Sequence, residues 1–183
     1  MLSQFSKEGE HATLADLFDF PKDVYPVGRL DSDSEGLLII TNDKNLNYKL
    51  LHPKFKHFRT YLAQVDGAID IEAIEKLQKG VDIKVNKQVY RTLPAKVKII
   101  DTPKEIEERK PPIRFRKNIP TSWIELSLSE GKNRQVRKMT AIVGYPTLRL
   151  IRIKIENLQL FPLKSGEVKE ISKNEIYRLL GLL

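Results

Sequence analysis

Cysteine is absent from this chain of 183 residues, and histidine occurs only three times. The absence of cysteine excludes disulfide frameworks, thiolate zinc sites and cysteine nucleophiles. His11, His52 and His57 are too scattered to suggest a metal centre built from histidines. No apolar run approaches the roughly 20 residues of a membrane-spanning helix, and the first residues lack a signal-peptide pattern. We therefore expect a soluble protein of the cytoplasm.

Charge is distributed unevenly along the chain, which has a net charge of +8. Residues 1–35 hold eight acidic and three basic residues, whereas residues 109–154 hold twelve basic and two acidic ones. Such a division suits a polyanion that is bound on one surface and processed at another. An ordinary solvated basic face is the alternative interpretation.

The hydrophobic pattern predicts an α+β protein with a mixed, mainly antiparallel sheet and flanking helices. Capping residues predict helices that begin after Thr13, Asp43, Asp70 and Ser172. A further, basic helix is expected to follow the Gly131 turn and to include residues 132–138. Strands are expected over residues 36–41, 60–65, 81–85, 95–100, 123–129 and 148–155. Residues 101–120 carry four prolines and are expected to form a surface excursion. The length suits one domain, 1–183, possibly with two lobes.

Three carboxylates crowd the entrance of an apolar run. Asp31, Asp33 and Glu35 follow the turn that begins at Gly28 and precede the run 37–40. Their mutual repulsion is a cost that usually marks a site. A calcium loop fails, because Asn42 stands where the template needs a bidentate Glu. Either a magnesium site remains, or Asp31 alone carries the chemistry while its neighbours are solvated or cap the turn.

A basic segment and one tyrosine are further candidates. On the expected helix, Arg134, Arg137 and Lys138 would share one broad face. They could clamp phosphates, one of them could pair with Asp31, or the helix could simply be amphipathic. Tyr61 lies in an expected strand, where its ring either packs in the core or stacks on a base with its hydroxyl available for proton transfer.

Together, these segments resemble one family of ribosomal RNA pseudouridine synthases. Its members are an A type that acts on small-subunit RNA and the B, E and F types, which act on large-subunit RNA. Three motifs carry the resemblance: Gly28-Arg29-Leu30-Asp31 followed by Gly36-Leu37-Leu38 and Thr41-Asn42-Asp43; Arg59-Thr60-Tyr61; and Glu130 to Met139. Residues 111–152 resemble the E-type subgroup in particular, which modifies a uridine in large-subunit (23S) ribosomal RNA.

The resemblance implies a catalytic core with a central cleft and assigns roles to residues of this sequence. Asp31 would be the catalytic carboxylate, Tyr61 the active-site tyrosine, and Arg137 the basic residue that pairs with Asp31. We expect the RNA to be bound by Arg29, Arg59, Arg114, Arg116, Lys117, Lys132, Asn133, Arg134, Gln135 and Lys138. Arg59 replaces the usual lysine and keeps its charge. No cofactor, metal or protein partner is implied, and a monomer is expected.

Two features of the chain depart from many relatives. The RNA-binding S4 domain is absent, as in the E-type subgroup. Members usually open with a strand carrying an Asn-Lys-Pro-type motif just before the segment equivalent to residues 2–5. We therefore expect the start at Met1 to reflect a truncation or a misassigned start.

Two other functions stay open on the sequence. A non-catalytic RNA-binding factor for ribosome assembly could use the same basic face and would tolerate loss of Asp31. A metal-dependent nuclease could use Asp31, Asp33, Glu35 and Asp43, and would depend on its metal.

Overall fold

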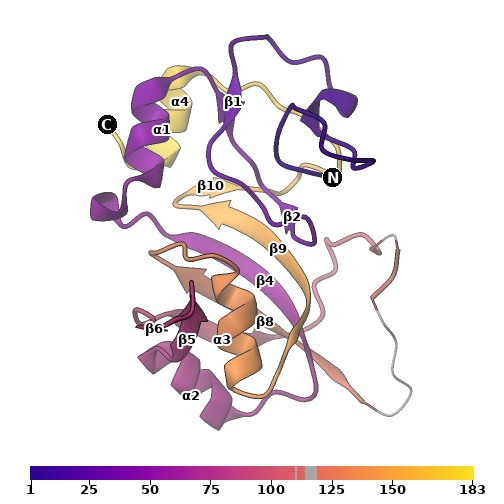
Figure 1. The fold of residues 1–183 in the computed structure, drawn as a ribbon, viewed down its shortest axis with the longest axis vertical. Helices are drawn as coiled ribbons and strands as arrows, with labels where there is room; N and C mark the ends of the chain where they lie inside the picture. The colour runs from indigo at the N-terminus through magenta and orange to yellow at the C-terminus, as the bar shows by residue number, and fades with distance from the viewer. Residues whose placement is uncertain (110, 114–118) are drawn as a thin grey trace. The chain divides into compact units, whose positions relative to one another are not determined.

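The computed structural model describes residues 1–109, 111–113 and 119–183, which divide into two compact units. Unit 1 comprises residues 1–57 and 152–183, and unit 2 comprises residues 58–151. Figure 1 labels their helices and strands. The strand β9 (Thr147–Ile155) crosses the boundary, so its first five residues belong to unit 2 and its last four to unit 1.

Unit 2 is built on an antiparallel sheet. Its strands are β4 (Arg59–Asp66), β7 (Lys96–Ile100), β8 (Thr121–Leu128) and the first part of β9, in the order β9-β4-β8-β7. Leu126 at the middle of β8 is opposite Tyr61 on β4 and Val97 on β7. Because strand residues alternate between faces, these three side chains and those two positions away from them lie on one face.

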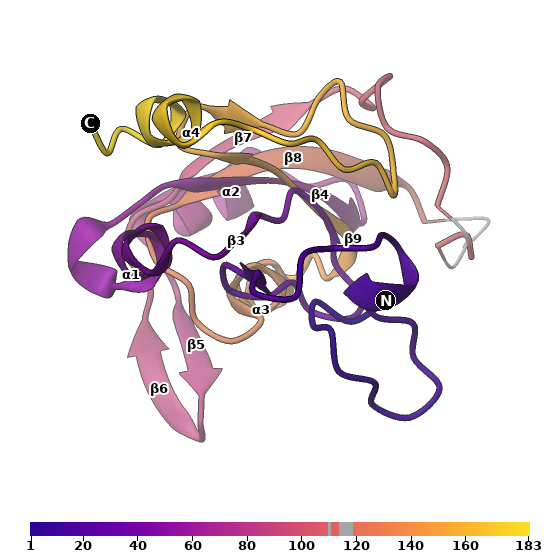
Figure 2. The ribbon, with the colours of Figure 1, turned by 90° about the horizontal axis from the view of Figure 1, so that it is seen from above.

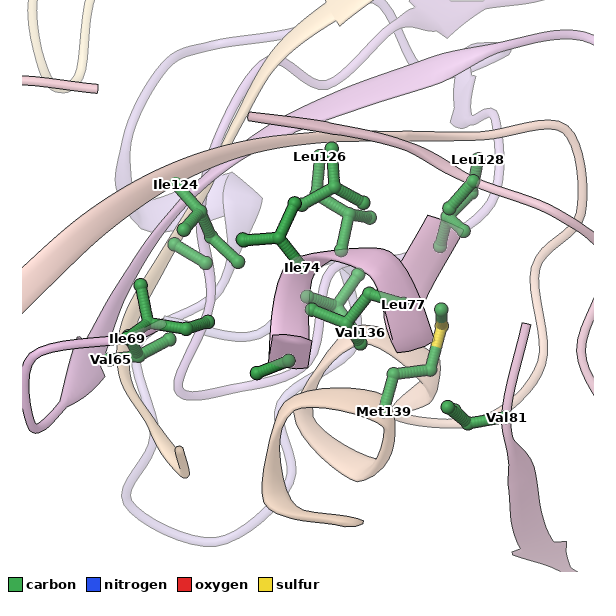
Figure 3. Close-up of a cluster of buried hydrophobic side chains, with 14 of the residues drawn as sticks. Val65, Ile69, Ile74, Leu77, Val81, Ile124, Leu126, Leu128, Val136 and Met139 are labelled. Carbon is green, nitrogen blue, oxygen red and sulfur yellow. The ribbon is translucent and has the colours of Figure 1, made fainter. Parts of the chain in front are cut away.

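Two helices cover that face. They are α2 (Ile71–Lys79) and α3 (Gln135–Ile142), and both lie on the same side of β4 and β8 (Figure 2). Figure 3 shows Ile74 and Leu77 of α2 and Val136 and Met139 of α3 meeting the sheet residues Ile124, Leu126 and Leu128. Burying a side chain of this size stabilises the fold by about 1.5–3 kcal/mol, so this cluster fixes α3 against the strands.

A hairpin completes unit 2. It consists of β5 (Asp82–Val85) and β6 (Gln88–Arg91) and projects from the helices in Figure 2. Asn86 and Lys87 join the strands, and both have positive φ, as a two-residue type I′ turn requires. The sequence predicts β5 but not β6, because a lysine at the second turn position is an uncommon signal.

Unit 1 has small two-stranded pairings and two packed helices. β1 (Tyr25–Pro26) pairs with β3 (Ile40–Thr41), whereas β2 (Glu35–Gly36) and β10 (Leu158–Gln159) pair with β9. The helix α1 (Lys44–Leu51) lies beside α4 (Lys173–Leu179) in Figures 1 and 2. Short 3-10 helices cover Leu14–Asp16 and Pro53–Phe55. A second apolar cluster includes Leu37, Ile39, Leu46, Ile176 and Leu180.

Asp43 connects the two helices of unit 1. Its carboxylate accepts hydrogen bonds from the amides of Asn45 and Leu46 at the start of α1. It also accepts the Tyr177 hydroxyl and lies 3.0 Å from Lys173 Nζ, both on α4. The lysine, followed by these hydrogen bonds, lowers the pKa of Asp43 to about 2.

The α+β prediction is confirmed, and so are the caps at Asp43, Asp70 and Ser172. The expected strand over residues 36–41 is wrong as one element. Gly36 has a φ of +109° and ends β2, and the chain pairs again only at Ile40, with a different partner strand. Leu37 and Ile39 are buried as expected, while Leu38 and Ile40 are half-buried. In the described residues, no helix is long and apolar enough to cross a membrane.

Candidate functional site

The segment that carries Asp31 is held in unit 1 by hydrogen bonds on its N-terminal side. The buried Ser3 hydroxyl accepts the amide of Leu30 at 3.1 Å and lies 3.3 Å from the carbonyl of the same residue. The Asp31 carbonyl accepts the Ser34 amide at 2.9 Å, which closes a turn over residues 31–34. Asp31 is half-buried, whereas Arg29 two residues earlier is exposed. The backbone of the candidate catalytic carboxylate is therefore fixed from residue 30 to residue 34.

A close backbone contact holds the same segment on its C-terminal side. A Cβ atom added to Gly36 would lie 2.2 Å from the Arg152 carbonyl oxygen and 2.7 Å from its amide nitrogen, so only glycine fits. The Leu37 amide donates to the Arg152 carbonyl at 2.8 Å, and Arg152 Nε donates to the Leu37 carbonyl at 2.8 Å. Arg152 is buried. The sequence does not predict this role, because a basic residue in a strand gives no local sign that it turns inward.

The acidic residues near Asp31 do not form a recognisable metal centre. Asp33 and Glu35 are half-buried like Asp31. Across the described part of the chain, no group of three or more His, Cys, Asp or Glu side chains is arranged to hold a metal ion.

Unit 2 carries Tyr61 and Arg59 on β4. Both side chains are half-buried and lie on the face that α2 and α3 cover, in alternation with the buried Thr60. Tyr61 packs against the cluster to which Val136 and Met139 of α3 belong. The Thr60 hydroxyl is hydrogen-bonded to the Ser127 hydroxyl at 2.6 Å on the opposite face. Tyr61 thus lies at the margin of the core, partly packed and partly accessible.

Glu130 organises the turn that precedes α3. Its carboxylate accepts hydrogen bonds from the Tyr90 hydroxyl, the Leu93 amide and the Gln135 side-chain amide, the last at 2.6 Å. This hydrogen bond to Glu130, with burial, raises the pKa of Tyr90 to about 12, so the phenol stays protonated at neutral pH. The Glu130 network therefore ties the β6–β7 connection to the start of α3.

Gln135 is the second organising residue of this turn. Only 4% of it is exposed, its Oε1 accepts the Lys132 amide at 2.9 Å, and its amide nitrogen lies 3.7 Å from Met139 Sδ. The geometry favours an internal role for Gln135 over contact with RNA. In the sequence, the only sign of this internal role is that Gln135 is uncharged within a basic stretch.

The helix itself begins later than expected. The prediction of one basic helix over residues 132–138 is wrong, because Arg134 is the N-cap residue in the left-handed region, with a φ of +51°. Only Arg137 and Lys138 are helical, so the three cations do not share one helix face. Arg137 is half-buried, and its Nη1 donates to the Thr147 carbonyl at 3.2 Å. This hydrogen bond orients the guanidinium toward the first residue of β9, in unit 2.

The predicted RNA-binding residues differ in exposure. Lys132, Asn133 and Arg134 are exposed on the turn before α3, and Lys138 is half-buried with its Nζ 3.4 Å from Asn133 Oδ1. Lys132 Nζ lies 4.5 Å from the centroid of the Tyr90 ring. Arg114, Arg116 and Lys117 lie outside the described residues. Unit 2 therefore brings Tyr61, Arg137 and the exposed cations around α3 to one face of its sheet, whereas Asp31 and Arg29 belong to unit 1.

Comparison with known proteins identifies the family. A family model described as RNA pseudouridylate synthase matches residues 3–141, which contain all three motifs. The chain is 52% identical over 170 residues to ribosomal large subunit pseudouridine synthase E of Vibrio parahaemolyticus, covering 93% of this chain and 69% of that protein. It is 46% identical over 162 residues to the protein of the same name from Xanthomonas axonopodis pv. citri, covering 87% and 83%.

A B-type relative and a solved structure agree with this. Ribosomal large subunit pseudouridine synthase B of Bacillus subtilis is 36% identical over 164 residues, covering 90% of this chain and 60% of that protein. A crystal structure of a pseudouridylate synthase superposes with a TM-score of 0.75 at 26% identity, covering 93% of this chain and 66% of that one. The expected resemblance to the E-type enzymes is confirmed, and the chain belongs to the RNA pseudouridylate synthase family.

Proposed function

We propose that this chain converts a uridine of large-subunit (23S) ribosomal RNA to pseudouridine, with Asp31 as the catalytic carboxylate. The identity of 52% with a relative named large subunit pseudouridine synthase E carries the choice of RNA. The choice of Asp31 is supported by its turn, which is held by Ser3 before it and by the contact between Gly36 and Arg152 after it. A carboxylate that acts on one sugar carbon needs such a fixed backbone, because misplacement by about 1 Å costs rate.

The reaction breaks an N-glycosidic bond, turns the base over and joins its C5 to the same sugar carbon. No electron is gained or lost and no outside atom enters, so the reaction itself calls for no cofactor. The uridine must leave its stack, which costs a few kcal/mol in a duplex and less in a loop. Asp31 then either attacks C1′ or removes the proton from C2′, and both routes require an ionised carboxylate.

Arg137 and Tyr61 complete the proposed machinery. Arg137 would pair with Asp31 and offset the cost of desolvating it, and the Thr147 carbonyl holds its guanidinium in one orientation. Tyr61 would stack on the detached base, so that the base rotates without escaping, and would accept the C5 proton at the end. The half-buried ring at the margin of the unit 2 core supports this role, because its packed side limits its motion.

The RNA would be held by basic and polar side chains. Arg29, Arg59, Lys132, Asn133, Arg134 and Lys138 are the described candidates for phosphate contacts, with Arg114, Arg116 and Lys117 proposed from the sequence alone. We assign Gln135 to the support of this surface rather than to contact with it. Binding should weaken as salt rises, because each neutralised phosphate releases counterions. We further propose that the protein acts in the cytoplasm as a monomer without a protein partner.

The test is the pair Asp31→Asn and Asp33→Asn, assayed by tritium release from RNA labelled at uridine C5. Asp31→Asn should bind RNA like the wild type and form no product. Asp33→Asn is the matched control, because Asp33 is a half-buried carboxylate of the same turn, and it should retain activity within a few-fold. Full activity of Asp31→Asn would refute the assignment of Asp31. RNA binding by the wild type without any tritium release would instead favour the alternative, a non-catalytic RNA-binding factor.

A further inference from the structure

Aromatic rings and lysines alternate at the C-terminal end of α1, in a part of unit 1 for which the proposed reaction has no use. The ring centroids of Tyr48 and His52 are 5.1 Å apart, and those of Tyr48 and Phe55 are 5.9 Å apart. Lys54 Nζ lies 5.6 Å from the Tyr48 centroid and 4.7 Å from that of Phe55. We call Tyr48, His52, Phe55, Lys54 and Lys56 the 48–56 platform.

The platform leaves apolar surface accessible. Tyr48 is 49% exposed and Leu51, between it and His52 in the chain, is 46% exposed. Packing within the cluster explains why an aromatic residue stands at position 55, because Phe55 is half-buried and stacked against His57. Packing does not explain why Tyr48 carries a ring that is about half exposed. An exposed ring beside cations is the arrangement that proteins use to stack unpaired bases while holding their phosphates.

The charge of this stretch is of one sign. Residues 44–57 contain the four lysines Lys44, Lys49, Lys54 and Lys56 and no acidic residue, whereas residues 1–35 of the same unit contain eight acidic residues. The platform is thus a basic stretch of unit 1, in contrast to residues 1–35. Its positive charge favours a polyanion as the occupant, and the aromatic rings favour one that carries planar bases.

The platform also adjoins the segment that carries Asp31. A Cβ atom added to Gly28 would lie 3.2 Å from Leu51 Cδ2, so the platform helix contacts the first residue of the turn that leads to Asp31. A nucleotide on Tyr48 would therefore be close in unit 1 to the backbone of the catalytic segment. We propose that the 48–56 platform binds an unpaired nucleotide that flanks the target uridine. This inference rests on the proposed function, because it names the RNA that the site would bind.

The experiment measures binding of a fluorescein-labelled oligoribonucleotide made only of adenosine and cytidine, and of the duplex formed with its complement. The single strand carries no uridine, so its binding does not depend on catalysis. Tyr48→Ala should weaken single-strand binding about 5- to 150-fold, because a stacked base contributes about 1–3 kcal/mol. Tyr48→Phe should bind like the wild type, and duplex binding should change less than two-fold in both variants, roughly the scatter expected for a surface substitution.

Two controls separate stacking and charge from general damage. Phe18→Ala removes a ring that is also 49% exposed in unit 1 but lies among acidic residues, and it should leave single-strand affinity unchanged. Lys54→Gln with Lys56→Gln should reduce the slope of log affinity against log salt by about 1.4, at about 0.7 per phosphate. The same double change at the exposed Lys164 and Lys169 should leave the slope unaltered.

Three outcomes would overturn the proposal. If Tyr48→Ala binds the single strand with wild-type affinity, no base stacks on Tyr48. If Tyr48→Ala loses the same affinity for single strand and duplex, the platform is only a non-specific cationic surface. Binding of polyglutamate as tight as that of the oligonucleotide, with the same dependence on Tyr48, would indicate an acidic protein instead. Absence of pseudouridine formation by the wild type would refute the proposed function while leaving these binding results interpretable.

Discussion

Gly36→Ala is the change whose effect the structure defines best. The backbone at Gly36 has a φ of +109°, which side chains rarely adopt, and an added Cβ would meet three backbone atoms of Arg152 within 2.9 Å. None of these atoms can move as a flexible side chain would. Relief of the contact must separate β2 from β9 and break the hydrogen bond from the Leu37 amide to the Arg152 carbonyl. The substitution therefore combines backbone strain with a steric conflict.

The expected loss follows from these two contributions. Positive φ at a residue with a Cβ costs about 1–2 kcal/mol, and overpacking against a fixed neighbour costs about 1–3 kcal/mol. The reduced flexibility of the unfolded chain returns about 0.4–1 kcal/mol. The net decrease in the free energy of unfolding is about 1–4.5 kcal/mol, against a typical total of about 5–15 kcal/mol. The variant should therefore fold, but with much reduced stability.

Two other glycines separate the contributions. Gly144 has a φ of +94° and nothing within 4 Å of an added Cβ, so Gly144→Ala should cost only the conformational part, about 1 kcal/mol. Gly131 has neither a positive φ nor a close neighbour, so Gly131→Ala should be neutral or slightly stabilising. The order of stability should be Gly131→Ala, then Gly144→Ala, then Gly36→Ala.

Urea denaturation followed by circular dichroism measures the order. With a slope of about 2 kcal/mol per M, Gly36→Ala should lower the midpoint by about 0.5–2 M. Equal midpoints for Gly36→Ala and Gly144→Ala would show that the contact with Arg152 contributes nothing. The reasoning that links Gly36 to the position of Asp31 would then fail as well.

Three further predictions concern the proposed site and the helix pair of unit 1. Tyr61→Phe should bind RNA and stall before product release, and wild-type turnover in the tritium assay would remove Tyr61 from the proton transfer. Arg137→Lys should lower the rate despite keeping its charge, because a single ammonium cannot form a bidentate pair; a rate near wild type would argue against that pairing. The folded-state pKa of Asp43, about 2, is below the unfolded value of 3.8, so its contribution is present above pH 4 and lost as the pH falls through 2. Asp43→Asn should therefore lower unfolding free energy by about 2 kcal/mol at pH 6, and a wild-type advantage that persisted at pH 2 would contradict this.

Local sequence patterns predict much of the fold. Asp43, Asp70 and Ser172 cap the helices that follow them, and each accepts a backbone amide within three residues of itself. The alternation of Ile124, Leu126 and Leu128 predicts the face of β8 that is buried. These features depend on residues close in the chain, so a sequence suffices to predict them.

The errors occur where distant residues decide. The run over residues 36–41 looks like one strand, but β2 and β3 have different partners, and Arg152 is more than a hundred positions away. Nothing local distinguishes the inward Arg152 from the exposed cations of the basic segment. The short strands β1 and β10 were missed because two residues carry no detectable period.

For the proposed site, the sequence by itself determined the candidate groups: a carboxylate after Gly28-Arg29-Leu30, a tyrosine in a strand and a basic segment from Glu130 onward. Only the tertiary structure decided how these parts are supported. In the tertiary structure, the buried Gln135 donates to Glu130, and Arg134 is a left-handed N-cap residue before α3. The backbone of Arg152 lies close to Gly36. The physical reason is that residue type fixes which reaction is possible, whereas long-range packing and hydrogen bonds fix which polar groups point inward.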